Sequence, residues 1–238
     1  MSTRKARQQA AALLESGLRQ FEQGQFDQAR EACERALKLA PRDPEALNLR
    51  GAIALQSGDH AGAVAFLRQA VALAPDQSAY HAHLAYGYVG LGHLPEALAA
   101  FERAARQAPD EPALQLGIGN CLGLMGKAAE AEGVLRRLVE RHPRFALGWF
   151  NLGKALEEQN RDEEACSLYF RATQLEPRSA EGHTNLGLAL SKLGRFAEAE
   201  HAHRASIACN PGYAASYVNL AIVLNALRRL PEAESMCR

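Results

Sequence analysis

The sequence predicts an all-α fold, a solenoid of helical hairpins, and three observations lead to this prediction. Alanine returns every 34 residues from Ala29 to Ala233, and proline keeps the same interval from Pro41 to Pro211. Within each interval, two stripes of apolar residues have the spacing of amphipathic helices. A fixed period of this length is the signature of a repeat array, in which each hairpin packs against its neighbours around a continuous core.

The recurring proline, placed at position 32 of each repeat, defines six full repeats and a truncated seventh. Residues 1–9 form a polar lead-in, and residues 10–238 form a single array. Positions are counted from the first residue of each repeat. The repeats, numbered 1 to 7, are 10–43, 44–77, 78–111, 112–145, 146–179, 180–213 and the truncated 214–238.

The first half of each repeat predicts a helix, called helix A, because positions 4, 7, 8 and 11 are mostly apolar or small, with Ser16 and Arg50 as exceptions at position 7. In repeat 5 these residues are Trp149, Leu152, Gly153 and Leu156. Position 8 is always small, which lets two helix backbones approach closely. The residues at position 8 are Gly17, Gly51, Ala85, Gly119, Gly153, Gly187 and Ala221.

A glycine or polar residue at position 15, such as Gly58 or Asn160, predicts the turn that ends helix A, since Gly and Asn tolerate a positive φ. The second half of the repeat predicts helix B, with a stripe at positions 20, 24 and 27. In repeat 5 this stripe is Ala165, Tyr169 and Ala172. The proline at position 32 then ends helix B. Each repeat is therefore helix A, a tight turn, helix B and a short loop.

The alanine at position 20 is predicted to lie where helices touch, so a larger side chain there would wedge them apart at a cost of about 1–3 kcal/mol. We expect Ala165→Leu to destabilise the array more than Ala105→Leu, because Ala105 falls at position 28, outside the recurring stripe.

These residues resemble the tetratricopeptide repeat over about residues 10–238. The departures from the pattern are Leu138 and Ser206 at position 27, and Cys33 and His203 at position 24. The resemblance implies a right-handed superhelix of helix pairs in which helix A lines a concave groove. It also implies a protein that binds peptides or partner proteins and has no chemistry of its own. Repeat 5 carries the whole family pattern, as Trp149, Leu152, Gly153, Ala165, Tyr169, Ala172 and Pro177.

Repeats 5 to 7 are similar to the superhelical arm that precedes the catalytic domain in O-linked N-acetylglucosamine transferases and related bacterial glycosyl- or sulfotransferases. The similarity rests on runs such as NLGKALEEQNRDEEA and NLGLALSKLGRF. It implies an alternative function, the substrate-recognition arm of such an enzyme, with the catalytic domain absent from this chain. The chain ends at Arg238 inside the pattern of a helix B. A third alternative is therefore a homo-oligomer joined through the terminal repeats.

In the family, positions 2, 5, 6, 9, 12 and 13 of helix A point into the groove. Position 6 is Asn in the last three repeats, as Asn151, Asn185 and Asn219. Carboxamides both donate and accept hydrogen bonds, so a ladder of them could pair with an extended peptide backbone whatever its sequence. The alternative is that they are solvated consensus residues. The candidate groove residues are Tyr86, Asn120, Asn151, Lys154, Asn185, Lys192 and Asn219.

The groove positions of the earlier repeats are more apolar, which would suit an amphipathic helix or a second copy of the chain. The alternative is that several of these side chains pack against neighbouring helices. They include Leu14, Leu18, Phe21, Leu49, Leu55, Tyr86, Val89 and Leu116.

Composition excludes several classes of function. Lys and Arg number 27 and so do Asp and Glu, so no long-range field favours nucleic acid or an anionic membrane. No apolar stretch reaches the roughly 18 residues of a spanning helix, and the start of the chain lacks a secretory signal. The five cysteines are scattered without a CxxC motif, which is typical of reduced thiols in a cytoplasmic protein.

No constellation of residues predicts catalysis, a metal or a cofactor. The two His-x-His pairs, His81/His83 and His201/His203, lie in predicted helices, where residues two apart point about 200° away from each other. Both rings of a pair therefore cannot reach one ion. The sequence predicts a non-enzymatic module whose partner is a protein or an extended peptide.

Overall fold

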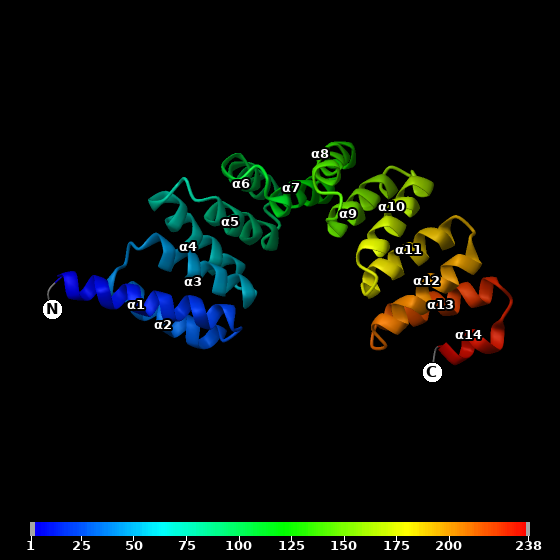
Figure 1. Cartoon of the computed structure of the whole chain (residues 1–238), viewed down its shortest axis with the longest axis horizontal. Helices are drawn as coiled ribbons and strands as arrows, with labels where there is room; N and C mark the ends of the chain where they lie inside the picture. Colours follow the sequence, from blue (N-terminus) through cyan, green and yellow to red (C-terminus); the bar gives the residue numbers. More distant parts are fainter. Residues whose placement is uncertain (1–2, 237–238) are drawn as a thin grey trace. The chain divides into compact units, whose positions relative to one another are not determined.

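In a computed structural model that describes residues 3–236, the chain folds into fourteen α-helices over those residues (Figure 1). Odd-numbered helices are the A helices of repeats 1 to 7, and even-numbered helices are the B helices. The helix α1 begins at Thr3, before the first repeat starts at residue 10. The helices are α1 (Thr3–Glu22), α2 (Phe26–Leu39), α3 (Pro44–Gln56), α4 (His60–Leu73), α5 (Ser78–Gly90), α6 (Leu94–Gln107), α7 (Pro112–Leu124), α8 (Ala128–Arg141), α9 (Ala146–Glu157), α10 (Asp162–Leu175), α11 (Ala180–Lys192), α12 (Phe196–Cys209), α13 (Ala214–Ala226) and α14 (Leu230–Met236).

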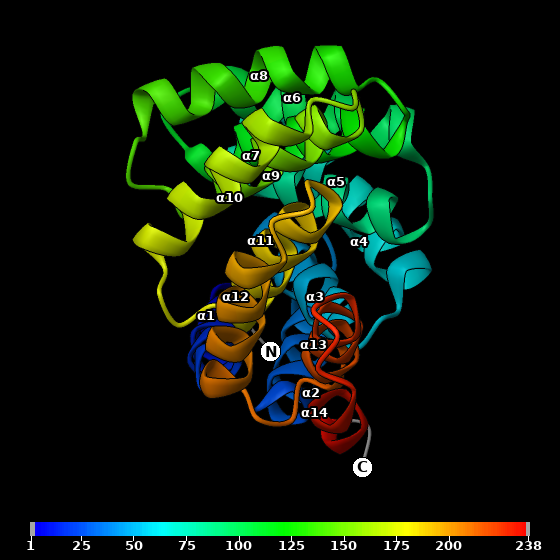
Figure 2. The same cartoon turned by 90° about the vertical axis from the view of Figure 1, so that its right-hand side faces the viewer.

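The chain divides into two compact units, an N-terminal unit Met1–Cys121 and a C-terminal unit Leu122–Arg238. In the N-terminal unit, each helix from α1 to α6 packs against the next, and α3 also contacts α1 and α5. In the C-terminal unit the same succession runs from α8 to α14, with α11 also contacting α13 (Figures 1 and 2). Within the two units, α2, α4, α10 and α12 are thus each packed between their own A helix and the A helix that follows. This is the packing expected of a repeat array.

The predicted turn at position 15 is confirmed. Five glycines at this position adopt φ between 72° and 75°, and Asn160 adopts a φ of 59°. In repeat 7 the position is Arg228, with a φ of 62°. A non-glycine residue in this region costs about 1–2 kcal/mol, so the turn geometry is imposed by the hairpin rather than by the residue.

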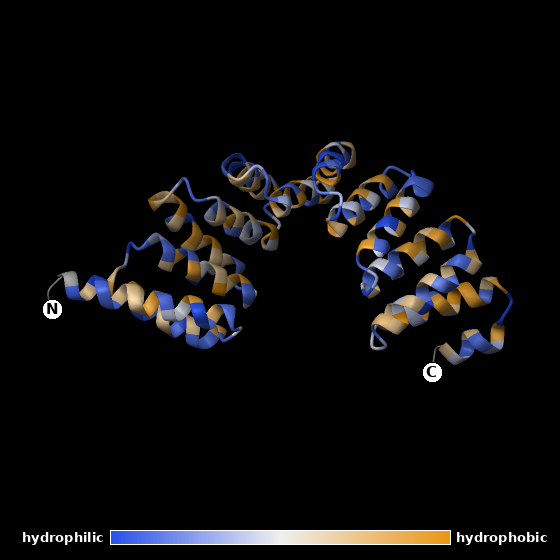
Figure 3. Cartoon of the chain, in the orientation of Figure 1, coloured by the Kyte–Doolittle hydropathy of each residue, from blue (hydrophilic) through white to orange (hydrophobic). Residues whose placement is uncertain are grey.

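The small residues lie where helices meet, as the pattern predicts. A Cβ built on Gly153 would stand 2.8 Å from the Tyr169 ring, and one built on Gly187 would stand 2.5 Å from the His203 ring. Both glycines are at position 8 and both rings at position 24, so helices A and B of one repeat touch through this pair. The alanines at position 20 of repeats 1 to 6 are at most 1% exposed, and Ala165 has no exposed surface. The helices carry both hydrophobic and hydrophilic residues (Figure 3), as expected of amphipathic helices.

Repeat 6 and the start of repeat 7 bury several polar side chains beside apolar ones such as Leu186 and Leu190. Ser206 and Ser216 have no exposed surface, and Thr184 is 4% exposed. Their hydroxyl oxygens form a triangle with sides of 2.6 to 2.8 Å, and Ser206 donates to the carbonyl of Ala180 at 2.7 Å. His203 is also fully buried, but neither ring nitrogen has a hydrogen-bond partner among the described residues. The hydroxyls are therefore satisfied and the imidazole is not.

Candidate functional site

The three asparagines at position 6 lie on successive A helices of the C-terminal unit, α9, α11 and α13. We call the surface at positions 2, 6, 9 and 13 of these helices the A-helix face. Its three asparagines are half-buried, and most of its other residues are exposed. The A-helix face consists of Leu147, Asn151, Lys154, Glu158, Glu181, Asn185, Leu188, Lys192, Ala215, Asn219, Ile222 and Ala226.

Two of the asparagines are held by their own helix. The Nδ2 of Asn151 donates to the carbonyl of Leu147 at 2.8 Å, and the Nδ2 of Asn185 donates to the carbonyl of Glu181 at 2.9 Å. One amide hydrogen of each is used in this bond, which fixes the side chain along the helix. The second hydrogen and the carbonyl oxygen stay available to a ligand. Each carboxamide can therefore still donate one bond and accept others.

Large apolar side chains flank the asparagines on this face. Leu147 is 46% exposed, Leu188 is 43% exposed and Ile222 is 62% exposed. They alternate along the A helices with the carboxamides and with charges of both signs. The A-helix face therefore combines backbone-type hydrogen bonding with apolar contacts and has no dominant charge.

The two predicted groove lysines differ in their surroundings. Lys154 is exposed on α9. The Nζ of Lys192 lies 2.6 Å from Oδ1 of Asp162 on α10, and this hydrogen bond raises the pKa of Lys192. Lys192 thus links helix A of repeat 6 to helix B of repeat 5 and is less free to meet a ligand than its position predicts.

Tyr86 and Asn120 belong to the N-terminal unit, on α5 and α7, and the other candidates belong to the C-terminal unit. Tyr86 is 46% exposed and packs edge-on against Phe101, with ring centroids 5.1 Å apart. Partial burial raises the pKa of its hydroxyl, and Glu111 and Cys121 add to the rise. Asn120 is exposed.

The expectation of an apolar groove in the earlier repeats is wrong for two of its residues. Leu14 and Leu49 are 6% and 2% exposed and belong to the core of repeats 1 and 2. The alternative, that such side chains pack against neighbouring helices, is correct for them. Exposed apolar residues on A helices concentrate instead in the C-terminal unit, where Val218 is 57% exposed in addition to those named above. An A helix buries two sides, and residue type alone does not show which side faces its neighbour.

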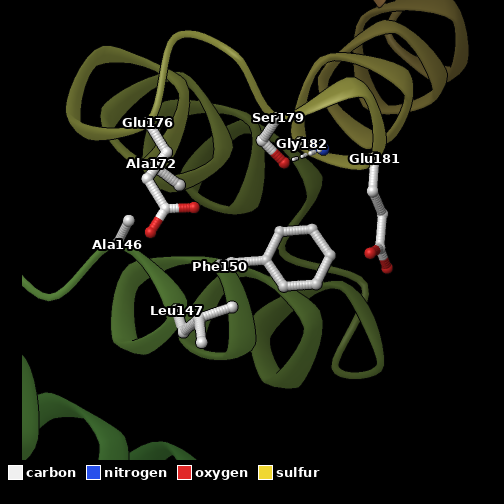
Figure 4. A pocket seen from close by; sticks show the side chains of 8 residues that line it. All are labelled: Ala146, Leu147, Phe150, Ala172, Glu176, Ser179, Glu181 and Gly182. Carbon is white, nitrogen blue, oxygen red and sulfur yellow. Dashed lines mark hydrogen bonds between the residues drawn. The ribbon is translucent and has the colours of Figure 1, made fainter. Parts of the chain in front are cut away.

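A small hollow of about 40 Å³ lies at the edge of the A-helix face, between α9 and the start of α11. Figure 4 shows the Phe150 ring near the centre of the view, with Leu147 below it and Glu181 on the right. The Ser179 hydroxyl accepts a hydrogen bond from the amide of Gly182 at 3.0 Å and caps α11. A space of this size holds little more than one water, so it suits the tip of one small side chain and not a cofactor.

Two buried cysteines and the first His-x-His pair are held within the fold. Burial raises the pKa of the Cys33 thiol to about 12 and that of Cys121 to about 11. His81 and His83 turn to different partners, the carbonyl of Pro75 and the amide oxygen of Asn48, each at 2.8 Å. Among residues 3–236, three or more potential metal ligands do not come together. Across the same stretch, every helix is too short or too polar to traverse a bilayer.

Comparison with known proteins gives one consistent answer. Two family models, both described as tetratricopeptide repeat, match residues 14–78, 125–181 and 184–238 in one case and residues 88–149 in the other. A search of curated proteins found no match.

Three solved structures illustrate the similarity. A thermophilic tetratricopeptide repeat protein of Thermus thermophilus is 26% identical over 76% of this chain and 98% of its own, with a TM-score of 0.62. A tetratricopeptide repeat protein of Parabacteroides merdae is 16% identical over 96% of this chain and 93% of its own, with a TM-score of 0.76. YrrB, a tetratricopeptide repeat protein "with an unusual peptide-binding site", is 21% identical over 79% of this chain and 96% of its own, with a TM-score of 0.58. Since the family models match most of the sequence, the predicted all-α repeat fold is confirmed and the chain belongs to the tetratricopeptide repeat family.

Proposed function

We propose that the chain is a non-enzymatic scaffold that binds an extended segment of a partner protein along the A-helix face. The observation that carries this proposal is the recurrence of Asn151, Asn185 and Asn219 at one position of three successive A helices. A structural neighbour described by its peptide-binding site supports the general class of ligand.

The chemistry of the face favours an extended peptide. The free oxygen of each carboxamide accepts a backbone N–H, and the free amide hydrogen donates to a backbone carbonyl. Every peptide presents these groups at regular intervals, so such contacts hold the main chain without selecting its sequence. The exposed side chains of Leu147, Leu188 and Ile222 then select for apolar residues in the bound segment.

The test is a triple variant, Asn151→Ala, Asn185→Ala and Asn219→Ala. Partners are captured with the intact wild-type chain and identified by mass spectrometry, and their affinities are then measured by calorimetry. Each lost hydrogen bond contributes about 0.5–1.5 kcal/mol, so we expect at least a tenfold loss in affinity with unchanged helical content by circular dichroism. Gln174→Ala, which removes an exposed carboxamide from α10, is the matched control. Equal affinities for the triple variant and the wild type would refute the proposal.

The alternative function, a substrate-recognition arm of a glycosyl- or sulfotransferase, would use the same asparagines. The only observation that favours this alternative is the spacing of 34 residues between the asparagines. Incubating captured peptides with a catalytic domain and a sugar or sulfate donor separates the two functions, because only a substrate arm increases the rate of peptide modification.

Self-association through the terminal repeat is a second proposal for the partner. The helices α13 and α14 enclose an open hollow of about 630 Å³ that includes Val218, Ile222 and Leu230, all more than half exposed. Contiguous apolar surface of this kind is typical of an interaction site. Light scattering over a range of concentrations tests it, and a monomer at every concentration would exclude it.

A further inference from the structure

An ion cluster recurs between B helices in the C-terminal unit. Between repeats 4 and 5, Arg161 donates through Nε and Nη2 to Glu164, both at 2.7 Å, and through Nη1 to Glu132 at 2.8 Å. Between repeats 6 and 7, Arg229 makes the same bonds at 2.6 Å, to Glu232 and to Glu200. We call this arrangement the ionic clip. It joins position 16 of one repeat to position 21 of the repeat before it.

A second arginine, at position 25, completes each clip. Arg136 lies 2.7 Å from Glu132, and Arg204 lies 2.9 Å from Glu200. Desolvation opposes the charge of Glu132, but hydrogen bonds from Gln159, Arg136 and Arg161 outweigh it and lower its pKa to about 2. Glu132 is therefore a carboxylate held between two guanidinium groups, and Glu200 lies between Arg204 and Arg229 in the same arrangement.

The junction between repeats 5 and 6 has the arginine of the clip without its carboxylate. Arg195 donates through Nε and Nη2 to Glu198, at 2.8 and 2.6 Å, as its counterparts do. Position 21 of repeat 5 is Cys166 and position 25 is Phe170, in place of the glutamate and the second arginine. Within residues 3–236, Nη1 of Arg195 has no hydrogen-bond acceptor. The guanidinium is held in the same way as in the two complete clips, with its third nitrogen free.

Arg195 lines a groove of about 630 Å³ between α10 and α12, with α11 at its base. The groove is apolar along most of its surface, where Phe170 is 54% exposed and Leu186 and Leu190 form the base. Arg195, Glu198, His183 and His201 are its charged or titratable members. Its volume lies within the range of binding pockets, and its few polar groups around apolar walls are typical of them.

We propose that this groove binds a partner protein through an acidic side chain next to a large apolar one. The carboxylate of the partner occupies the place that Glu132 and Glu200 take in the complete clips and accepts a hydrogen bond from Nη1 of Arg195. The neighbouring apolar side chain packs on Phe170 and Leu186. A hydrogen bond between arginine and a carboxylate is strong because both groups are charged. Apolar contact beside it favours a segment that carries an acidic and an apolar side chain.

The shape of the groove favours a protein segment over a small carboxylic acid. Its residues run from Arg195, which directly precedes α12, to Ala205 on that helix, which is a length of roughly 15 Å at the rise of an α-helix. A small acid would cover only the end near Arg195 and leave the end near Ala205 uncovered. The groove lies on the B-helix side, and its residues are distinct from those of the A-helix face, so it is a second site beyond the proposed function.

The experiment uses fluorescent synthetic peptides with Glu next to Leu or Phe, and matched peptides with Gln in place of Glu. Binding to the intact chain is measured by fluorescence anisotropy. We expect the Glu peptides to bind at least about tenfold more tightly than the Gln peptides, as for a hydrogen bond to a charged group. Arg195→Gln should abolish this difference. Arg141→Gln, which removes an exposed arginine from α8, should leave it unchanged.

Cys166→Glu provides the sharpest test, because it rebuilds the clip with a carboxylate from the chain itself. We expect this variant to fold as the wild type does and to bind the Glu peptides at least about tenfold more weakly. Equal binding of Glu and Gln peptides to the wild type, or no binding of either at millimolar concentration, would overturn the proposal. Binding of octanoate or phenylacetate in the absence of peptide binding would assign the groove to a small acid instead. Concentration-dependent self-association that Arg195→Gln abolishes would assign it to a second copy of the chain.

Discussion

Replacing the buried His203 with Phe should stabilise the protein. The His203 ring has no exposed surface, and both of its nitrogens lack hydrogen-bond partners among residues 3–236. Tyr169 occupies the same position in repeat 5 and packs against Gly153 as His203 packs against Gly187. Since a six-membered ring already fits this arrangement, Phe should fit at position 203.

The magnitude follows from two terms. A buried polar group without a partner costs about 1–3 kcal/mol, and the Phe variant should recover this cost at neutral pH. In addition, burial lowers the pKa of His203 from 6.5 to about 4. Between these two values the unfolded chain binds a proton that the folded chain does not, so the wild type loses stability as pH falls from 6.5 to 4. The full loss is about 3 kcal/mol, and the variant lacks it.

The assay is urea denaturation of wild type and variant at pH 7 and pH 4.5, with hydrogen exchange of α12 amides as the local readout. The stability difference between the two proteins should grow by about 2 kcal/mol or more from pH 7 to pH 4.5. His201→Phe, at an exposed position of the same helix, is the control and should show no such growth. A difference that stays constant with pH would refute the argument, because it would mean that the His203 ring is not an unpaired neutral imidazole in the folded protein.

Three further predictions concern packing and the ionic clip. Tyr169→Phe removes the 2.8 Å hydrogen bond to Glu157 and should lower the unfolding free energy by about 0.5–1.5 kcal/mol in urea denaturation. Ala165→Leu should destabilise by about 1–3 kcal/mol, whereas Ala208→Leu, at an exposed site, should leave the melting temperature unchanged; equal melting temperatures would contradict the packing. Glu132→Gln should destabilise at pH 7 by about 1 kcal/mol, and the difference should disappear as pH falls from 4.5 towards 2, because over that interval the unfolded wild-type chain gains a proton that the folded carboxylate does not; a difference that persists at pH 2 would exclude this cause.

The sequence predicts the hairpins well because the repeat supplies several independent copies of each position. The turn at position 15 is an example, since Asn160 takes the same backbone conformation as the glycines there. The width of the buried face is harder to predict. Ala105 lies outside the recurring stripe, yet it is only 8% exposed. A B helix packs against two A helices, so its buried face is wider than the three positions that recur, and Ala105→Leu is not the neutral control that the pattern indicates.

The repeat positions of the candidate site residues can be predicted from the sequence, but the side chains that they contact cannot. Counting repeats places Asn151 and Asn185 at one position of neighbouring A helices. It does not show that Lys192 is bonded to Asp162, because that partner lies on another helix and 30 residues away. The incomplete clip at Cys166 did leave a signal in the sequence. It becomes visible only when position 21 is compared between repeats and the glutamates there are known to share a structural role.

The helix α11 contributes residues to both proposed sites, and this gives the two sites a common readout. One side of α11 carries Asn185 and Leu188 of the A-helix face, and the other provides Leu186 and Leu190 at the base of the B-helix groove. A ligand that binds only the folded state stabilises the element it contacts. Occupation of either site should therefore slow hydrogen exchange in α11. Asn185→Ala should remove that protection for a ligand of the A-helix face alone, and Arg195→Gln should remove it for a ligand of the groove alone. Loss of both protections in either variant would mean that the two surfaces act as one site, contrary to the proposal that they are separate.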